Sequence, residues 1–235
     1  MTLLIRSNFS RIKKNKLFWI CLAVLLIYCI GFSIHANTHS FKDFLDNYPI
    51  FGLNGHPFIG IFIFLITFAV INDEFKTITI RNKLVIGYSK KQIYLSELIT
   101  ATTLSVLIVE LFYFITILSS YQTRSIVSAY TLFINFIANA IVVCTYTAIY
   151  TCIIMNSKNS IASLLKGFTL LGATFFVVDI IGNNTFLSLL SILPYGQSKL
   201  IAEFAMEPLY WLFNTIIIII FSAIGITKFN KSNIK

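Results

Sequence analysis

Six long apolar runs, separated by short segments that hold most of the charged residues, dominate this sequence. A helix needs about 20 mostly apolar residues to cross the hydrocarbon core of a bilayer, and each run is close to that length. The chain is 57% hydrophobic and only 11% charged, which exceeds the apolar content of a soluble globular domain. We therefore predict an all-α, polytopic membrane protein with one domain over residues 1–235. The six predicted transmembrane helices cover about residues 17–34, 51–71, 98–118, 130–155, 161–181 and 209–227.

The second run is the least regular of the six. Gly52, Gly55 and Pro57 interrupt its beginning, and only residues 57–71 are uniformly apolar. This span is therefore either short or begins as a re-entrant turn.

The basic residues predict how the spans are oriented. Most of the 18 Lys and Arg residues lie before the first run, between residues 72 and 97, at Lys158 and in the C-terminal tail. The alternate loops hold only Lys42, Arg124 and Lys199. Because cytoplasmic loops carry the excess of positive charge, both termini are expected in the cytoplasm. The net charge of +9 therefore reflects membrane orientation and does not indicate nucleic acid binding.

Residues 2–16 have the pattern of an amphipathic helix at the membrane surface. Ile5, Phe9 and Ile12 recur at helical spacing on one face. We predict an N-terminal elbow helix that lies on the cytoplasmic leaflet. The basic side chains expected to project away from the apolar face are Arg6, Arg11, Lys13 and Lys14.

The segment of residues 71–99, between the second and third spans, is longer and more charged than a turn requires. Ser89 and Gln92 fit a capping box, which marks a helix start, and Gly87 suits the end of a preceding helix. We predict a short helix at about residues 75–86, a bend at Gly87-Tyr88, and a second helix that runs into the third span.

The predicted short helix has a basic side and an apolar side. Lys76 and Lys83 are seven residues apart and share a face, whereas Ile78 and Val85 share a neighbouring apolar face. The β-branched run of residues 77–80 weakens helix propensity, so this helix needs packing against another surface to persist. These features favour a docking element. A solvated basic loop in contact with anionic lipid is the alternative.

Within this segment the chain resembles a known family. Asp73-Glu74 at the end of the second span, residues 77–83 and residues 87–91 are similar to a motif of the permease subunits of type-2 ABC exporters of bacteria. That family commonly has glycine where this chain has Lys76. The six-span plan and the N-terminal elbow extend the resemblance over nearly the whole chain.

The resemblance implies that residues 75–86 form a coupling helix, which sits in a cleft of a cytoplasmic ATPase subunit. It also implies short extracellular helices between the fifth and sixth spans, and a second permease copy. Permeases of this size and composition resemble exporters of bacteriocins, antimicrobial peptides and phenol-soluble modulins. The coupling residues that it implies are Asp73, Glu74, Phe75, Lys76, Thr77, Ile78, Arg81, Asn82 and Lys83.

The chain lacks the signature of a nucleotide site or of an enzyme. No G-x-x-x-x-G-K-[ST] sequence occurs, so ATP and magnesium are expected on a partner ATPase subunit, and this chain is expected to bind no cofactor. The four cysteines lie inside apolar runs, and His35, His39 and His56 lack a regular metal-ligand spacing. We predict a non-catalytic subunit without a metal site.

Polar residues inside the predicted spans are candidates for a transport pathway, because an ionised side chain in the bilayer is costly unless it faces protein or water. Glu110 lies near the centre of the third span, where it could line the pathway and meet a cationic substrate, or have a protonated or hydrogen-bonded packing role. Asn135 and Asn139, one helical turn apart, indicate hydrogen bonds between helices. Asp179 lies near the outer end of the fifth span.

These observations favour the permease subunit of an ATP-driven exporter in a bacterial plasma membrane. The expected partners are a cytoplasmic ATPase subunit, a second permease copy, membrane lipid, and an amphipathic or hydrophobic peptide as cargo. The alternative is a stand-alone immunity or binding protein that captures a peptide without ATP. Both homomeric and heteromeric permease pairs, and both export and extraction from the bilayer, fit the sequence.

Overall fold

The computed structural model of this chain describes residues 1–38, 57–76, 79–119, 129–157, 159–180 and 208–232. Every regular element among these residues is an α-helix, so the all-α prediction is confirmed for the described part of the chain. The helices are α1 (Thr2–Ile12), α2 (Lys16–Thr38), α5 (Pro57–Lys76), α6 (Thr79–Val85), α7 (Lys90–Ser119), α9 (Ala129–Met155), α10 (Ser160–Ile180) and α13 (Pro208–Lys231).

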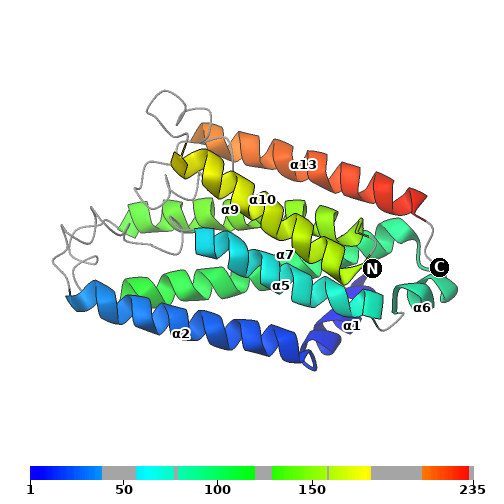
Figure 1. The fold of residues 1–235 in the computed structure, drawn as a ribbon, viewed down its shortest axis with the longest axis horizontal. Helices are drawn as coiled ribbons and strands as arrows, with labels where there is room; N and C mark the ends of the chain where they lie inside the picture. The colour runs from blue at the N-terminus through cyan, green and yellow to red at the C-terminus, as the bar shows by residue number, and fades with distance from the viewer. Residues whose placement is uncertain (39–56, 77–78, 120–128, 158, 181–207, 233–235) are drawn as a thin grey trace.

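The long helices lie side by side in an elongated bundle, and the two short helices gather at one end of it (Figure 1). α9 packs against α13, α7, α5 and α10, so it forms the centre of the bundle. The core is rich in aromatic side chains: Phe64 of α5 makes edge-on contacts with Tyr150 of α9 and Phe168 of α10. α1 packs against α7, and α6 packs against α5 and α7. We call the end of the bundle that carries these two helices the α6 end.

A helix occupies each of the six predicted span positions, and three of these helices are long and apolar enough to cross a membrane. The described apolar stretches of α2, α5 and α10 are shorter. The count of six spans, and the elbow position of α1 on a membrane, therefore stay predictions. The three long apolar stretches are Lys90–Ile115, Leu132–Met155 and Leu209–Lys231.

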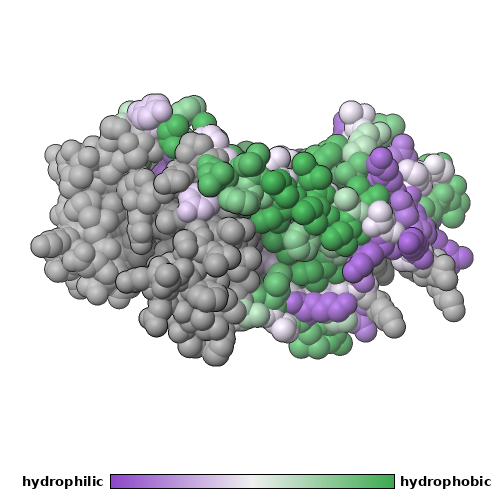
Figure 2. Space-filling model, turned by 90° about the horizontal axis from the view of Figure 1, so that it is seen from above, coloured by the Kyte–Doolittle hydropathy of each residue, from purple (hydrophilic) through white to green (hydrophobic). Residues whose placement is uncertain are grey.

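The outer surface of the bundle is apolar. α13 exposes a row of isoleucines, including Ile219, and α2 exposes Ile27. Figure 2 shows hydrophobic side chains over the middle of the molecule and hydrophilic side chains gathered toward the α6 end. Such a surface favours contact with lipid along the bundle and with water or headgroups at the α6 end.

The boundary between α5 and α6 differs from the prediction. α5 begins at Pro57, a residue suited to the first turn of a helix, and continues through Lys76. It continues because residues 72–76 contain neither glycine nor proline. The short helix predicted at residues 75–86 is therefore wrong at its start, since Phe75 and Lys76 end α5 and α6 begins at Thr79.

Two predicted features lie outside the described residues. These are the first residues of the second span, 51–56, and the segment of residues 181–207, where the resemblance implies extracellular helices.

Candidate functional site at the α6 end

A tight turn, fixed by local hydrogen bonds, joins α6 to α7. The Tyr88 amide donates to the Lys83 carbonyl at 3.1 Å, and the Gly87 amide donates to the Leu84 carbonyl at 3.0 Å. This pair is a Schellman motif, which suits the φ of 103° at Gly87 because glycine has no Cβ.

The start of α7 is a capping box, as predicted. Ser89 Oγ accepts the Gln92 amide at 3.2 Å, and Gln92 Oε1 accepts the Ser89 amide at 2.9 Å. The predicted bend at Gly87-Tyr88 and the helix that follows it are both confirmed.

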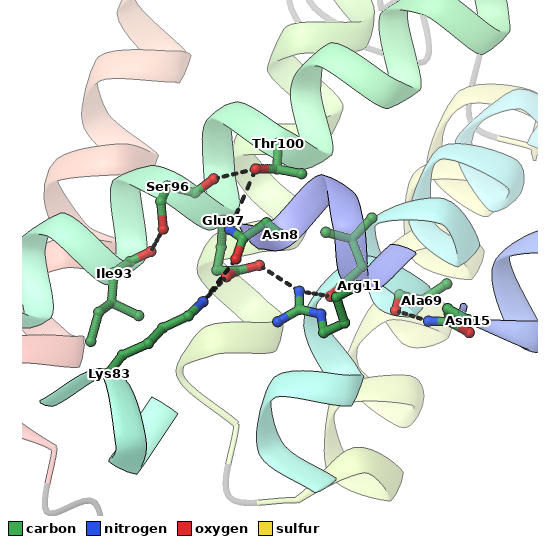
Figure 3. Close-up of polar contacts among 10 residues, drawn as sticks. Asn8, Arg11, Asn15, Ala69, Lys83, Ile93, Ser96, Glu97 and Thr100 are labelled. Atoms are coloured by element: carbon green, nitrogen blue, oxygen red, sulfur yellow. Dashed lines mark hydrogen bonds and ion pairs between the residues drawn. The ribbon is translucent and has the colours of Figure 1, made fainter. Parts of the chain in front are cut away.

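A buried carboxylate on α7 joins α1, α6 and α7 (Figure 3). Glu97 Oε1 accepts Lys83 Nζ of α6 at 3.0 Å, and Glu97 Oε2 accepts Arg11 Nη2 of α1 at 3.3 Å. Asn8 of α1 adds two contacts: its Oδ1 accepts Lys83 Nζ at 2.8 Å, and its Nδ2 donates to Thr100 Oγ1 at 3.4 Å. We call these five residues the Glu97 cluster.

The Glu97 cluster is largely closed to solvent. Glu97 and Asn8 are fully buried, and Lys83 is 5% exposed. Burial lowers the pKa of Lys83, while the neighbouring Glu97 carboxylate acts in the opposite direction. Because two cations share one carboxylate, the positions of α1 and α6 both depend on Glu97.

α1 is also fastened to α5 and to the start of α2. Arg11 Nη2 donates to the Val70 carbonyl at 2.8 Å, and Asn15 Nδ2 donates to the Ala69 carbonyl at 2.7 Å. Asn15 Oδ1 caps α2 by accepting two backbone amides of its first turn. Arg11 therefore points into the protein, and the prediction that it projects away with the other basic side chains of residues 2–16 is wrong. The reason is the buried Glu97 carboxylate, which attracts it.

The opposite face of α6 is open. Arg81 and Asn82 are exposed, Val85 is 81% exposed, and Ile86, which directly follows α6, is 74% exposed. We call these four residues the α6 outer face. Two neighbouring apolar side chains beside an arginine suit an apolar cleft with an acidic rim on a partner protein.

The residues that the resemblance assigned to coupling are found in three places. Arg81 and Asn82 lie on the α6 outer face, whereas Lys83 turns inward to Glu97. Residues 73–76 form the last turn of α5, and the side chains of Asp73, Glu74, Phe75 and Lys76 lie outside the described part of the structure. Thr77 and Ile78 lie outside the described residues.

Sequence reasoning missed the Glu97 cluster. Glu97 is the only acidic residue between Glu74 and Glu110, and it follows a segment rich in lysine and arginine. That isolation was a usable signal. Asn8 gave no signal in the sequence. It lies on the buried face of α1, at helical spacing from Leu4 and Ile12, where a sequence pattern predicts an apolar residue.

Glu110 is found elsewhere, between α7 and α9. Glu110 Oε1 accepts Asn139 Nδ2 of α9 at 3.1 Å, which confirms the predicted interhelical hydrogen bond of Asn139. Glu110 lies about 20 Å along the axis of α7 from Glu97, at 1.5 Å per residue. It therefore belongs to a different site from the Glu97 cluster.

The described residues contain no group of three or more His, Cys, Asp or Glu side chains that could hold a metal ion. Cys21, Cys144 and Cys152 are free thiols. His39 and His56 lie outside the described residues, as does the side chain of Asp179.

A comparison with models of protein families gives a match. A family model described as ABC-2 family transporter protein matches residues 4–183, which is well over half of the chain. The matched region includes the whole Glu97 cluster and the α6 outer face. Neither the curated proteins nor the solved structures give a match.

Proposed function

This chain belongs to the ABC-2 family of transporter proteins, and we propose that it is the permease subunit of an ATP-driven exporter of amphipathic peptides. As an ABC-2 permease it is a membrane transport component that works with an ABC ATPase subunit. In this proposal ATP and magnesium bind to the ATPase subunit, and no cofactor binds to this chain. The task of the permease is then to convert closure of the ATPase into movement of helices.

The main support for the proposal is that α6 has one side bonded to the bundle and one side exposed. Its inner side is fixed by Lys83 to Glu97, and its outer side presents Val85 and Ile86. An ATPase cleft that receives the α6 outer face would push on a helix that is ion-paired to the bundle. The displacement of α6 would reach α7 through Glu97, and α1 through Arg11.

α7 is suited to carry that displacement into the bundle. It is one continuous helix of 30 residues, about 45 Å long. It packs against α9, α5 and α13. Because interiors are close-packed, a shift at the start of α7 changes its packing against all three helices.

We place the α6 end in the cytoplasm of a bacterial cell, together with both termini. Exposed cations at this end support that orientation, because cytoplasmic segments carry the excess of positive charge. A second permease copy is needed to complete a pathway between two bundles. The assignment of peptides as cargo is supported by the size and composition of the chain, which resemble those of bacterial peptide exporters. The exposed cations include Arg6, Lys13, Lys14, Arg81 and Lys91.

A double substitution on the α6 outer face tests the docking role. Val85→Ser and Ile86→Ser together remove two apolar side chains that are mostly exposed, so the permease should still insert and fold. Affinity for the ATPase subunit, measured by binding to the purified permease, should fall about tenfold or more, because two apolar side chains no longer become buried. ATP-driven export of a fluorescent amphipathic peptide should fall with it.

Leu3→Ser is the matched control, because Leu3 of α1 is also apolar and 69% exposed. It should leave ATPase binding unchanged. Unchanged binding in the α6 double variant would remove α6 as the docking element. Export by the purified permease without an ATPase subunit would contradict the proposed division of labour.

A further inference from the structure

Glu110 is a buried acid that the coupling role does not use. It lies inside the bundle and is 6% exposed. Its Oε1 accepts Asn139 Nδ2, whereas its Oε2 is buried and has no hydrogen-bond partner among the described residues. An ionised carboxylate with one bare oxygen in an apolar bundle is costly, because it has lost its hydration without a full replacement.

Further polar side chains lie at the adjacent turns. Tyr113, one turn along α7 from Glu110, is buried, and so is Asn135 on α9. Asn135 and Asn139 are one turn apart. One hydrogen bond, from Asn139 to Glu110, therefore connects α7 and α9, and two further buried polar side chains lie one turn away. We call these four residues the Glu110 cluster.

The contact between Thr145 and Asn214 is a neutral polar contact between two helices of the bundle, and it serves as a comparison for Glu110. Thr145 Oγ1 of α9 donates to Asn214 Oδ1 of α13 at 2.8 Å, and Asn214 Nδ2 donates to the Tyr210 carbonyl at 2.9 Å. Both residues are neutral, and both ends of the Asn214 amide are paired. Glu110 differs because it is ionisable and its Oε2 has no hydrogen-bond partner in the part of the chain that the structure describes. An acid inside a membrane bundle with one oxygen left unbonded is a candidate partner for a positively charged ligand.

We propose that the Glu110 cluster binds the positively charged group of the cargo, so that the transporter selects cationic amphipathic peptides. This inference rests on the proposed function and narrows its substrate class. The ammonium group of a lysine side chain or of a peptide N-terminus donates to Glu110 Oε2. Nearby turns of α7 and α9 expose apolar side chains that suit the apolar side of such a peptide: Leu111, Phe114, Phe133 and Phe136.

The position of Glu110 on α7 connects cargo binding to the ATPase. A peptide reaches Glu110 Oε2 only when α7 and α9 separate at this level, since the oxygen is buried in this structure. α7 is also the helix that Glu97 joins to α6. The ATPase would therefore act on the same helix that holds the cargo.

The test compares two synthetic peptides with one amphipathic helical sequence, one with free lysines and one with acetylated lysines. Binding of the fluorescent peptides is measured on the permease–ATPase complex in nanodiscs of neutral lipid, without ATP. Glu110→Gln keeps the side-chain volume and removes the charge. It should weaken binding of the free-lysine peptide about tenfold or more, and should change binding of the acetylated peptide less than about twofold.

Thr145→Val is the control, because it removes a neutral polar contact between α9 and α13. It should leave both affinities unchanged. Should Glu110→Gln fail to fold, the wild-type complex decides: the free-lysine peptide must bind about tenfold more tightly than the acetylated one.

Three outcomes would overturn the site: equal losses for both peptides, no loss for either, or no binding of the free-lysine peptide to the wild type. ATP-driven transport is measured separately. If Glu110→Gln has no selective effect on peptide binding but the complex still transports the peptides with ATP, the proposed Glu110 site is wrong. The proposed exporter function then still holds.

Discussion

Glu97 is the residue on which the geometry of the α6 end depends. Its carboxylate is shared by Lys83 and Arg11, and it is fully buried. Forming a buried ion pair gains little net stability, but removing one partner is costly, because a charge stays behind in the interior. The cost of a substitution in the Glu97 cluster therefore depends on which partner is removed.

We expect Glu97→Gln to destabilise the permease by about 3–5 kcal/mol, because two cations lose the carboxylate that they share. Lys83→Met should cost less, about 1–2 kcal/mol, since Glu97 keeps Arg11 and methionine fills the space of the lysine stem. Chemical unfolding in detergent micelles measures both. Lys91→Met, at an exposed position of α7, is the control and should have little effect. Equal effects of the three substitutions would contradict the shared role of Glu97.

The partners of residues that act locally could be predicted from the sequence, whereas the partners of residues that act at a distance could not. Ser89, Gln92 and Gly87 bond to groups within a few positions, so their roles followed from spacing. Glu97 and Arg11 are 86 positions apart. No local pattern relates them, because their contact depends on how α1 is placed against α7.

At the scale of helices, the hydrophobic pattern predicted where each long helix lies but not how neighbouring helices meet. The predicted and observed positions of α9 nearly coincide, since a long apolar run specifies its own helix. The junction of α5 and α6 was predicted wrongly, because charged residues can continue a helix as readily as they can begin one. The inward turn of Lys83 could not be predicted, since it depends on the α7 face beside it.

The contact between α13 and α7 gives a prediction at this scale. A Cβ atom at Gly225 of α13 would lie 2.0 Å from the Tyr94 hydroxyl oxygen of α7. We expect Gly225→Ala to destabilise the permease by about 1–3 kcal/mol, because the two helices must move apart. Thermal unfolding in detergent measures this change.

Gly172→Ala is the matched control for that substitution. A Cβ atom at Gly172 of α10 would meet no atom within 4 Å. This variant should be neutral or stabilising by up to about 1 kcal/mol, because alanine favours a helix. Adding Tyr94→Phe to Gly225→Ala should restore part of the lost stability. A Gly225→Ala permease as stable as the Gly172→Ala permease would contradict close packing of α13 on α7.

At the scale of the whole molecule, the described residues form an apolar body that leads to the hydrophilic α6 end. The apolar surface over the middle suits lipid (Figure 2), and α1, α6 and the start of α7 lie at the hydrophilic end (Figure 1). The proposed coupling requires that this end face the cytoplasm, where an ATPase subunit can reach the α6 outer face.

The most direct measurement of that claim is the accessibility of a single cysteine at the end of α6. Ile86→Cys is placed in a chain whose four native cysteines are replaced by alanine, and cells are treated with a membrane-impermeant maleimide. We predict labelling only after permeabilisation, and slower labelling when the ATPase subunit is co-expressed. Labelling of intact cells, or the same labelling rate with and without the ATPase subunit, would contradict it.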